Sequence, residues 1–471
     1  EPQMTGIGGD CFALVKPAGG EQVLALNGSG VAPAAASAAA LRDRGMTTVP
    51  VASADAVTVP AAMDAFCTMS DTWGRLGLAD SLAPVIRYFD EGVPVAPRVA
   101  YDWAADADRL QGHGRDWYLS GGAVPRTGDM FRLTGQAEVL RRVARHGRDA
   151  FYTGEVADDM LATLCAAGGV HTEADFAAVA ATPCDPVGGV YHGSELLEHP
   201  PNGQGATAIL LLNILSHFDL SAMAPFGAAR AHIEAEATKL AYDARNRFLA
   251  DPDHTTHLAH MLSPETAAQL AALIDPARVL PPVAPPTEAV HKDTIYITVV
   301  DGDGMAVSLI YSIFHGFGSG LASEKFGILL QNRGAGFTLT QGHPNELAGG
   351  KRPMHTIIPG MVRQQGRVVM PFGVMGGQYQ PTGHARLLTN LLDYGLDLQS
   401  AVDAPRCFVE GKQLMVERGY GADVCAALAD LGHDVAVREG ALGGAQAIWM
   451  HDSGVLEGAS DPRKDGCALG Y

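Results

Sequence analysis

Apolar and polar residues follow two different periods along this chain, and the change between them falls near residue 290. Over residues 34–250 the apolar residues recur mainly at helical spacing, and the clearest helices are expected at 34–42, 137–147 and 228–247. After residue 293 the dominant period is the two-residue alternation of a strand. The pattern predicts a helix-rich first part followed by a strand-rich second part.

Strands are also predicted inside the helix-rich part. The apolar runs at 12–15 and 23–26 flank the turn sequence Pro-Ala-Gly-Gly, and a short strand pair is expected near 189–191 and 196–197. Farther on, a hairpin is expected at 356–371, with a helix behind it at 381–394. Helices and sheets are therefore mixed, which is typical of the α+β class.

A proline-rich segment, Leu-Pro-Pro-Val-Ala-Pro-Pro-Thr at 280–287, separates the two parts. Proline lacks an amide donor and fixes φ, so we expect an exposed, extended linker. A hairpin follows it, with strands at 295–300 and 306–313 around Asp301-Gly302-Asp303-Gly304. The turn resembles the start of a calcium loop, but the later ligands and the closing Glu are missing, which favours a plain turn. We place the boundary between residues 1–293 and 294–471.

Composition and charge narrow the class of protein. Hydrophobic residues make up 47% and charged residues 18% of the 471 residues, as in compact globular chains. The net charge of −19 disfavours nucleic acid and anionic membranes, and no apolar run reaches the roughly 20 residues of a membrane span. We expect a small-molecule substrate, with no nucleic-acid and no membrane partner.

No cofactor and no metal site is predicted. The seven cysteines are scattered and contain no CxxC pair, which argues against a disulfide framework or a zinc site. His254, His257 and His260 have the spacing of a metal-binding helix face, but their polar neighbours disfavour that interpretation. The cysteines weakly favour the cytoplasm. The chain begins without Met and inside a motif, so we expect an incomplete N-terminus, and a periplasmic location stays open.

The junction Asp293–Thr294 combines the linker with a chemically useful residue. A threonine at the start of a strand is usually a packing or capping residue. If the bond before Thr294 were cut, however, this residue would carry both a hydroxyl nucleophile and an α-amine. The reference pKa of an α-amine, about 7.7–8.0, lets it accept the hydroxyl proton near neutral pH. Asp293 and Thr294 are therefore the candidate cleavage site, and Thr294 is the candidate nucleophile.

Gly376 and Gly377 follow an apolar strand and are the candidate oxyanion donors. The plain interpretation is a turn. The functional one is that two backbone N–H groups without side chains approach a tetrahedral oxyanion, which is worth about 3–4 kcal/mol per donor.

These features resemble the γ-glutamyltranspeptidase family of N-terminal-nucleophile (Ntn) hydrolases over nearly the whole chain. The matching motifs, in order, are Thr-Gly-Ile-Gly-Gly-Asp (5–10), Phe-Tyr-Thr-Gly (151–154), Thr-Glu-Ala-Asp-Phe (172–176), Asp-Pro-Asp (251–253), residues 294–320, Lys-Arg-Pro (351–353), Gly-Gly (376–377), Asp-Ala-Pro-Arg (403–406) and Gly-Ala-Ser-Asp-Pro-Arg (458–463). The resemblance implies a four-layer αββα sandwich formed jointly by residues 1–293 and 294–471. It also implies self-cleavage into a heterodimer of the two fragments, with further dimerisation left open. On the same grounds Thr294 is the nucleophile, Ser312 the hydroxyl that supports it, and Gly376 and Gly377 the oxyanion pair.

Positions that bind the zwitterionic end of a γ-glutamyl substrate in that family differ in this chain. Ser29 stands where the family has an Arg, Phe314 replaces an Asn, and Arg333 and Gly336 replace a Gln and an Asp. The family's paired serines are His355 and Thr356, and His315 lies beside them by homology. A site that loses these partners loses several kcal/mol of γ-glutamyl binding.

The substitutions leave three functional hypotheses. Arg333 suits a carboxylate, which would make the enzyme an amidohydrolase for a small acid, similar to the family branches of oxamate amidohydrolases and cephalosporin acylases. A structural ion pair explains Arg333 equally well. The alternatives are a genuine γ-glutamyltransferase or glutathione hydrolase, and an inactive member acting as a binding protein. Candidate substrate contacts are Arg333, Phe314, His315, Ser29, His355 and Thr356.

Overall fold

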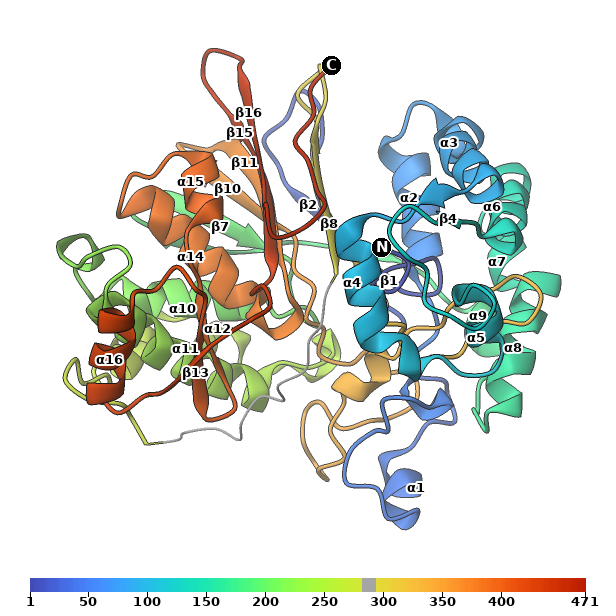
Figure 1. Cartoon of the computed structure of the whole chain (residues 1–471), viewed down its shortest axis with the longest axis horizontal. Helices are drawn as coiled ribbons and strands as arrows, with labels where there is room; N and C mark the ends of the chain where they lie inside the picture. Colours follow the sequence, from blue (N-terminus) through green and yellow to red (C-terminus); the bar gives the residue numbers. More distant parts are fainter. Residues whose placement is uncertain (282–293) are drawn as a thin grey trace.

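Two antiparallel sheets lie face to face in the computed structural model, which describes residues 1–281 and 294–471, and helices cover both outer surfaces (Figure 1). The five-stranded sheet has the order β5 (Thr182–Cys184), β2 (Leu24–Gly28), β1 (Asp10–Lys16), β9 (Ala306–Ser312) and β8 (Ile295–Val300). The six-stranded sheet has the order β16 (Leu456–Ser460), β15 (Gly444–Met450), β11 (Arg367–Met375), β10 (Gly360–Gln364), β7 (Ser194–Glu198) and β6 (Val187–Tyr191). Each sheet combines strands from before residue 282 and after residue 293.

Alternation along β1 explains how one strand contacts two layers. Phe12 and Leu14 pack with residues of the six-stranded sheet, including Met375 and Met361. The intervening side chains, with Ala13 among them, pack against the helix on the other side. Successive side chains of a strand point to opposite faces, so an apolar strand such as β1 is buried on both sides.

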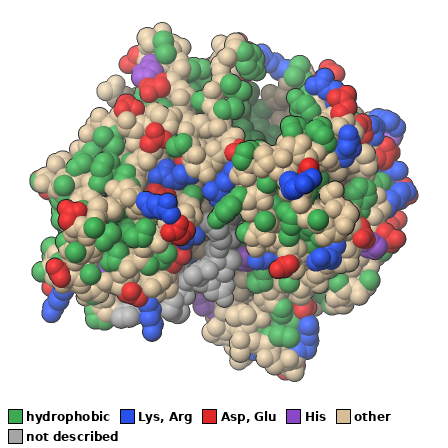
Figure 2. Space-filling model, viewed as in Figure 1, with side chains coloured by type: hydrophobic (Ala, Val, Ile, Leu, Met, Phe, Trp, Pro, Cys, Tyr) green, Lys and Arg blue, Asp and Glu red, His purple; other side chains and the backbone are tan. Residues whose placement is uncertain are grey.

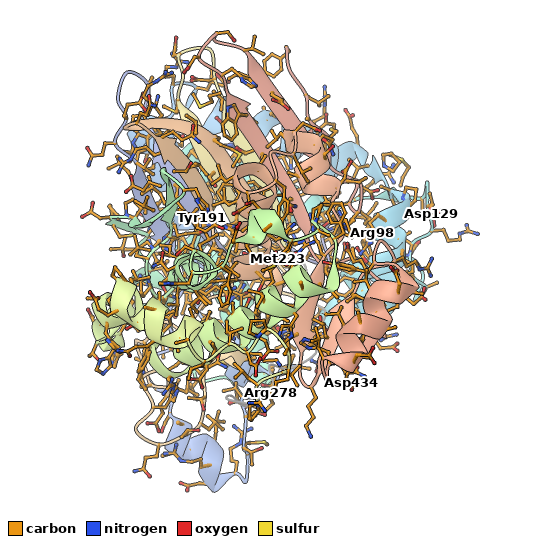
Figure 3. All side chains as sticks on the ribbon, turned by 90° about the vertical axis from the view of Figure 1, so that its left-hand side faces the viewer. Arg98, Asp129, Tyr191, Met223, Arg278 and Asp434 are labelled. Atoms are coloured by element: carbon orange, nitrogen blue, oxygen red, sulfur yellow. The ribbon has the colours of Figure 1, made fainter. Side chains whose placement is uncertain are left out.

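One outer layer covers the six-stranded sheet. It contains α10 (Gly205–Leu215), α11 (Ala228–Phe248), α12 (Leu258–Met261), α13 (Pro264–Ala271), α14 (Gln380–Leu392) and α15 (Leu398–Asp403). Helix α10 is apolar on every side and packs between the sheet and α11, which makes it the centre of the largest core cluster. Figure 3 looks onto this layer, with Met223 labelled near its middle.

The other outer layer lies on the five-stranded sheet. Helix α2 (Ala62–Trp73) packs directly on it. Beyond α2 lie α3 (Gly77–Glu91), α6 (Thr134–His146), α7 (Asp149–Tyr152) and α8 (Glu155–Ala166), at the right of Figure 1. The sheets and helices together form the expected four-layer αββα sandwich.

Smaller elements surround these layers. They are α1 (Ala38–Asp43), α4 (Pro97–Asp106), α5 (His113–Tyr118), α9 (Glu173–Ala177), α16 (Ala422–Asp430), the pair β3 (Val93–Pro94) and β4 (Met130–Phe131), and a sheet of β12 (Cys407–Glu410), β13 (Gln413–Val416) and β14 (Asp434–Val437). No helix within the described ranges is long and apolar enough to cross a membrane. On the face drawn in Figure 2, acidic and basic side chains are interspersed, most densely along the right-hand edge.

Most of the predicted elements are confirmed, with shifted ends. Strands β1, β2 and β6 to β11 and helices α6, α11 and α14 lie where the periodicity places them. The helix expected at 34–42 begins later, at Ala38, because the Ser37 hydroxyl accepts a hydrogen bond from the Ala40 N–H and caps it there. At the predicted turn the Gly304 N–H donates to the Asp301 carbonyl at 3.0 Å, as a hairpin requires. Most of the predicted linker falls within residues 282–293, outside the described residues.

Candidate active site around Thr294

Thr294 is buried at the start of β8, with 1% of its surface exposed. Strand β8 pairs with β9 so that Ile295 faces Tyr311, and one further step along the ladder brings Thr294 to Ser312. The Thr294 hydroxyl donates to the Ser312 Oγ at 3.3 Å. The predicted nucleophile and its predicted supporting hydroxyl are therefore in contact. Asp293, the other half of the predicted cleavage site, lies outside the described residues.

Ser312 connects Thr294 to the loop that follows β9. Its Oγ accepts a hydrogen bond from the Phe314 N–H at 2.9 Å. Phe314 has a φ of 80°, which a non-glycine residue adopts only when its surroundings enforce it. This backbone conformation turns the Phe314 amide back toward Ser312 and leaves the phenyl ring against Arg333, whose Cζ lies 4.0 Å from the ring centroid.

Arg333 is fully buried and only partly satisfied. Its Nη1 donates to the Thr356 Oγ1 at 2.8 Å. Its Nε and Nη2 have no hydrogen-bond partner within the described part of the chain. Burial lowers the pKa of Arg333 to about 9, and the charge of Asp10 partly opposes that shift. Because Nε and Nη2 form one edge of the guanidinium plane, the open edge is the one that binds a carboxylate in a bidentate manner.

His355 and Asp10 form a buried pair beside Arg333. The His355 Nδ1 accepts from the Ile357 N–H at 3.3 Å, which leaves Nε2–H to donate to the Asp10 carboxylate at 3.1 Å. Burial, together with the charge of Arg333, lowers the pKa of His355 to about 3. His355 is thus a neutral imidazole at physiological pH, and it binds the Asp10 carboxylate through Nε2–H.

Ser29 and His315 are both buried, and each contacts an asparagine. The Ser29 hydroxyl donates to the Asn27 side chain at 2.7 Å and also lies 3.2 Å from the Asn202 side-chain nitrogen. The His315 backbone N–H and its Nδ1 both contact the Asn332 side-chain oxygen, at 3.2 and 3.1 Å. The His315 contacts join the loop after β9 to Asn332, the residue before Arg333.

Gly376 and Gly377 end strand β11 with φ angles of 122° and 57°. Contacts between β8 of one sheet and β11 of the other show where the two glycines lie relative to Thr294. The Thr298 hydroxyl donates to the Pro371 carbonyl, and a Cβ on Gly373 would collide with the Tyr296 ring. A step from Thr298 back to Tyr296 along β8 thus corresponds to a step from Pro371 forward to Gly373 along β11. One more step of two residues pairs Thr294 with Met375, so we infer that Thr294 lies next to the glycine pair.

The sequence gives little indication of the residues that connect the glycine pair to the loop of Thr356. The Gln204 side-chain amide donates to the Thr356 carbonyl at 2.6 Å and to the Gly377 carbonyl at 3.0 Å. The buried Arg245 guanidinium donates to the Gln204 Oε1 at 2.8 Å and also binds the Gln378 side chain. Only the placement of Gln204 among the glycines of Pro-Asn-Gly-Gln-Gly hints at a special backbone position.

Comparisons with known proteins show the family of the chain. The family model described as gamma-glutamyltranspeptidase matches residues 1–471. The chain is 35% identical to the oxamate amidohydrolase proenzyme of Klebsiella pneumoniae, over 100% of this chain and 91% of that one. It is 34% identical to the glutathione hydrolase-like YwrD proenzyme of Bacillus subtilis, with the same coverage of both chains.

A solved structure gives the same result for the fold. The crystal structure of cephalosporin acylase from Bacillus halodurans superposes with a TM-score of 0.92 at 38% identity, covering 100% of this chain and 89% of that one. The whole chain thus matches proteins named as hydrolases and an acylase of the same fold. It is an amide-hydrolysing enzyme of the Ntn type and belongs to the γ-glutamyltranspeptidase family.

Proposed function

We propose that this chain is a self-processing N-terminal-threonine amidohydrolase, and that its acyl substrate is a small acid whose carboxylate binds Arg333. The open, buried edge of the Arg333 guanidinium carries the proposal. Leaving two charged N–H donors buried without acceptors costs several kcal/mol, so the edge has a strong demand for an anionic ligand. No carboxylate of the described residues lies within ion-pair distance of it, and the nearby Asp10 is bound to His355, Gly30 and Gln331. A structural ion pair, the competing explanation, therefore has no partner in the described part of the chain.

The position of Arg333 sets the size of the substrate. The nucleophile and the guanidinium are connected through only two residues, Ser312 and Phe314. A carboxylate held by Arg333 would thus lie close to the carbonyl carbon that Thr294 attacks. This arrangement favours a compact acid amide such as oxamate over a γ-glutamyl group, in which three carbons separate the α-carboxylate from the reacting carbonyl.

The proposed chemistry begins with the cut before Thr294, in which its hydroxyl attacks the preceding peptide carbonyl and water then releases the ester. In the mature enzyme the new α-amine takes the proton from Thr294 Oγ as the oxygen attacks the substrate amide carbon. The N–H groups of Gly376 and Gly377 stabilise the oxyanion. The tetrahedral intermediate then collapses as the C–N bond breaks, and the leaving amine receives the proton. Water hydrolyses the acyl-enzyme ester and restores Thr294.

The names of two relatives support this substrate class. One is named an oxamate amidohydrolase and another, in the solved structure, a cephalosporin acylase. The name glutathione hydrolase-like, on a relative of equal similarity, keeps γ-glutamyl substrates as the alternative to test.

Mass spectrometry and two substrates test the proposal. The purified wild-type chain should separate into fragments ending at 293 and beginning at 294, whereas Thr294→Ala should stay intact. Ammonia release from oxamate should exceed p-nitroaniline release from γ-glutamyl-p-nitroanilide by at least tenfold in kcat/KM. An uncut wild-type chain would refute self-processing, and a preference for the anilide would refute the substrate class.

A further inference from the structure

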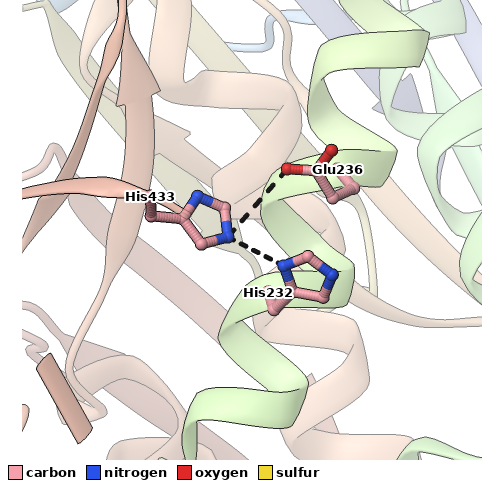
Figure 4. Close-up of side chains that lie close together, drawn as sticks. All are labelled: His232, Glu236 and His433. Atoms are coloured by element: carbon pink, nitrogen blue, oxygen red, sulfur yellow. Dashed lines mark hydrogen bonds and ion pairs between the residues drawn. The ribbon is translucent and has the colours of Figure 1, made fainter. Parts of the chain in front are cut away.

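Three buried side chains far from Thr294 converge from two separate regions of the chain. His232 and Glu236 lie four residues apart on α11 and share one face of that helix. His433 follows α16 and lies across from them. One ligand-type atom of each residue lies within 4.8 Å of the others. Figure 4 shows the three side chains together. His232 and Glu236 are completely buried, and His433 is 7% exposed.

The hydrogen bonds around His232 orient its imidazole for coordination. The His232 Nε2 lies 2.8 Å from the Asp275 carbonyl oxygen, which can only accept, so Nε2 carries the proton. The lone pair is then on Nδ1, which accepts a hydrogen bond from the His433 Nε2–H at 2.8 Å, and a bound metal ion would take the place of that proton. An outer N–H donated to a backbone carbonyl is the arrangement that fixes metal-bound histidines in proteins.

We propose that His232, Glu236 and His433 bind a divalent transition-metal ion of the zinc type. Two imidazole nitrogens and one carboxylate are a ligand set that zinc prefers, with a water completing the tetrahedron. At Zn–N distances of about 2.0–2.1 Å the two nitrogens would be about 3.3 Å apart, so loading separates the rings by roughly half an ångström. The Glu236 Oε1, now 4.0 Å from the His433 nitrogen, would move closer.

Lys239 competes for the same carboxylate. Its Nζ donates to the Glu236 Oε1 at 2.6 Å, and its side chain is 20% exposed. The lysine can therefore turn toward solvent when a metal takes its place. If the three residues bind a metal ion, removing the Lys239 ammonium should therefore strengthen metal binding. A cluster with a purely structural role would show no such effect.

The site would also join the two parts of the chain. Two ligands precede residues 282–293 and the third follows them, so an ion here would hold the fragments together if the chain is cut as proposed. The preceding segment touches both sides of the cluster. The Leu280 N–H donates to the Glu236 Oε2 at 2.7 Å, and the Val279 N–H donates to the Leu431 carbonyl at 3.0 Å. Figure 3 labels Arg278, the residue before Val279, and Asp434, the residue after His433.

Cobalt and zinc binding to the tag-free, metal-stripped protein tests the site. Titration with Co²⁺ should give one equivalent with visible d–d absorption, and Zn²⁺ should displace it. Glu236→Gln and His433→Gln should each weaken Co²⁺ affinity by more than the roughly 10–100-fold that losing an outer-shell partner costs. Lys239→Gln should tighten it. The measurements use Thr294→Ala as well as the wild-type chain, so that failure of self-processing cannot be mistaken for failure of metal binding.

The matched control removes exposed histidines that could bind metal nonspecifically. The double variant His254→Gln/His260→Gln should leave the Co²⁺ spectrum and affinity unchanged. The proposal is overturned if the wild-type chain binds no Co²⁺, if binding survives in both Glu236→Gln and His433→Gln, or if only the double variant loses it. Unchanged or weaker binding in Lys239→Gln, which alters a partly exposed side chain, would also overturn it.

Discussion

The side-chain amide of Gln204 donates a hydrogen bond to the carbonyl oxygen of Gly377 at 3.0 Å. The same amide nitrogen donates to the Thr356 carbonyl at 2.6 Å. One side chain thus holds the glycine pair proposed to bind the oxyanion and also the loop that carries the Arg333 partner. Gln204 is in turn fixed by Arg245, so the arrangement is buried and has little freedom to adjust.

Replacing Gln204 by Glu should lower kcat with a much smaller change in KM. A carboxylate cannot donate to the Gly377 and Thr356 carbonyls, so the glycine N–H groups lose their support while substrate contacts at Arg333 persist. Loss of one oxyanion donor costs about 10²–10³ in kcat, and misplacement should approach the lower end of that range. Steady-state kinetics with the best acid amide measure the effect. Gln269→Glu, at an exposed position on α13, is the control. A Gln204→Glu defect confined to KM would contradict the positioning role.

Ser312 should tolerate Thr but not Ala. The hydroxyl accepts from both Thr294 and the Phe314 N–H, and its loss would leave a buried donor unsatisfied. That deficit of about 1–3 kcal/mol corresponds to roughly fivefold to 150-fold in rate. Both the cut before Thr294 and amide turnover should slow in Ser312→Ala and recover in Ser312→Thr. Gel bands over time measure the first, and ammonia release the second. Equal rates in Ser312→Ala and wild type would refute the contact's role.

Arg333→Lys should fail to replace arginine in binding an acidic substrate. The proposed contact uses two parallel N–H groups on one guanidinium edge, and an ammonium cannot reproduce them. We expect KM for oxamate to rise about 10–100-fold in Arg333→Lys and at least as much in Arg333→Met. Oxamide, a neutral amide of nearly the same size, should lose little in either variant. If oxamate and oxamide lost activity equally, Arg333 would be supporting the fold instead of the carboxylate.

The parts of the site that lie within one local pattern could be predicted from the sequence. The hairpin that places Thr294 beside Ser312 follows from alternation and a turn motif within about twenty residues. The pairing of Gln204 with Gly377 could not be predicted, because 173 residues separate them and neither belongs to a periodic pattern. The same holds for His232 and His433, which are 201 residues apart. His254, His257 and His260 have the local spacing of metal ligands, an interpretation that their polar neighbours disfavour, and the structure places them along an exposed turn and a short helix.

Acid should destabilise the protein through His199, whose imidazole stacks on Phe12 in the buried layer between the sheets. Burial lowers its pKa to about 4, and the charge of Arg352 adds to the shift. Between the unfolded pKa of about 6.5 and the folded value, the unfolded chain binds one more proton than the folded chain. The stability that this residue contributes is therefore complete above pH 6.5 and is lost as the pH falls toward 4, at up to about 1.4 kcal/mol per pH unit.

Urea unfolding of the Thr294→Ala chain at pH 7.0, 6.0 and 5.0 measures this slope. His199→Gln should flatten it by about that amount, and His451→Gln, on the exposed hairpin between β15 and β16, should leave it unchanged. Equal slopes in His199→Gln and its parent would show that another group causes the acid sensitivity.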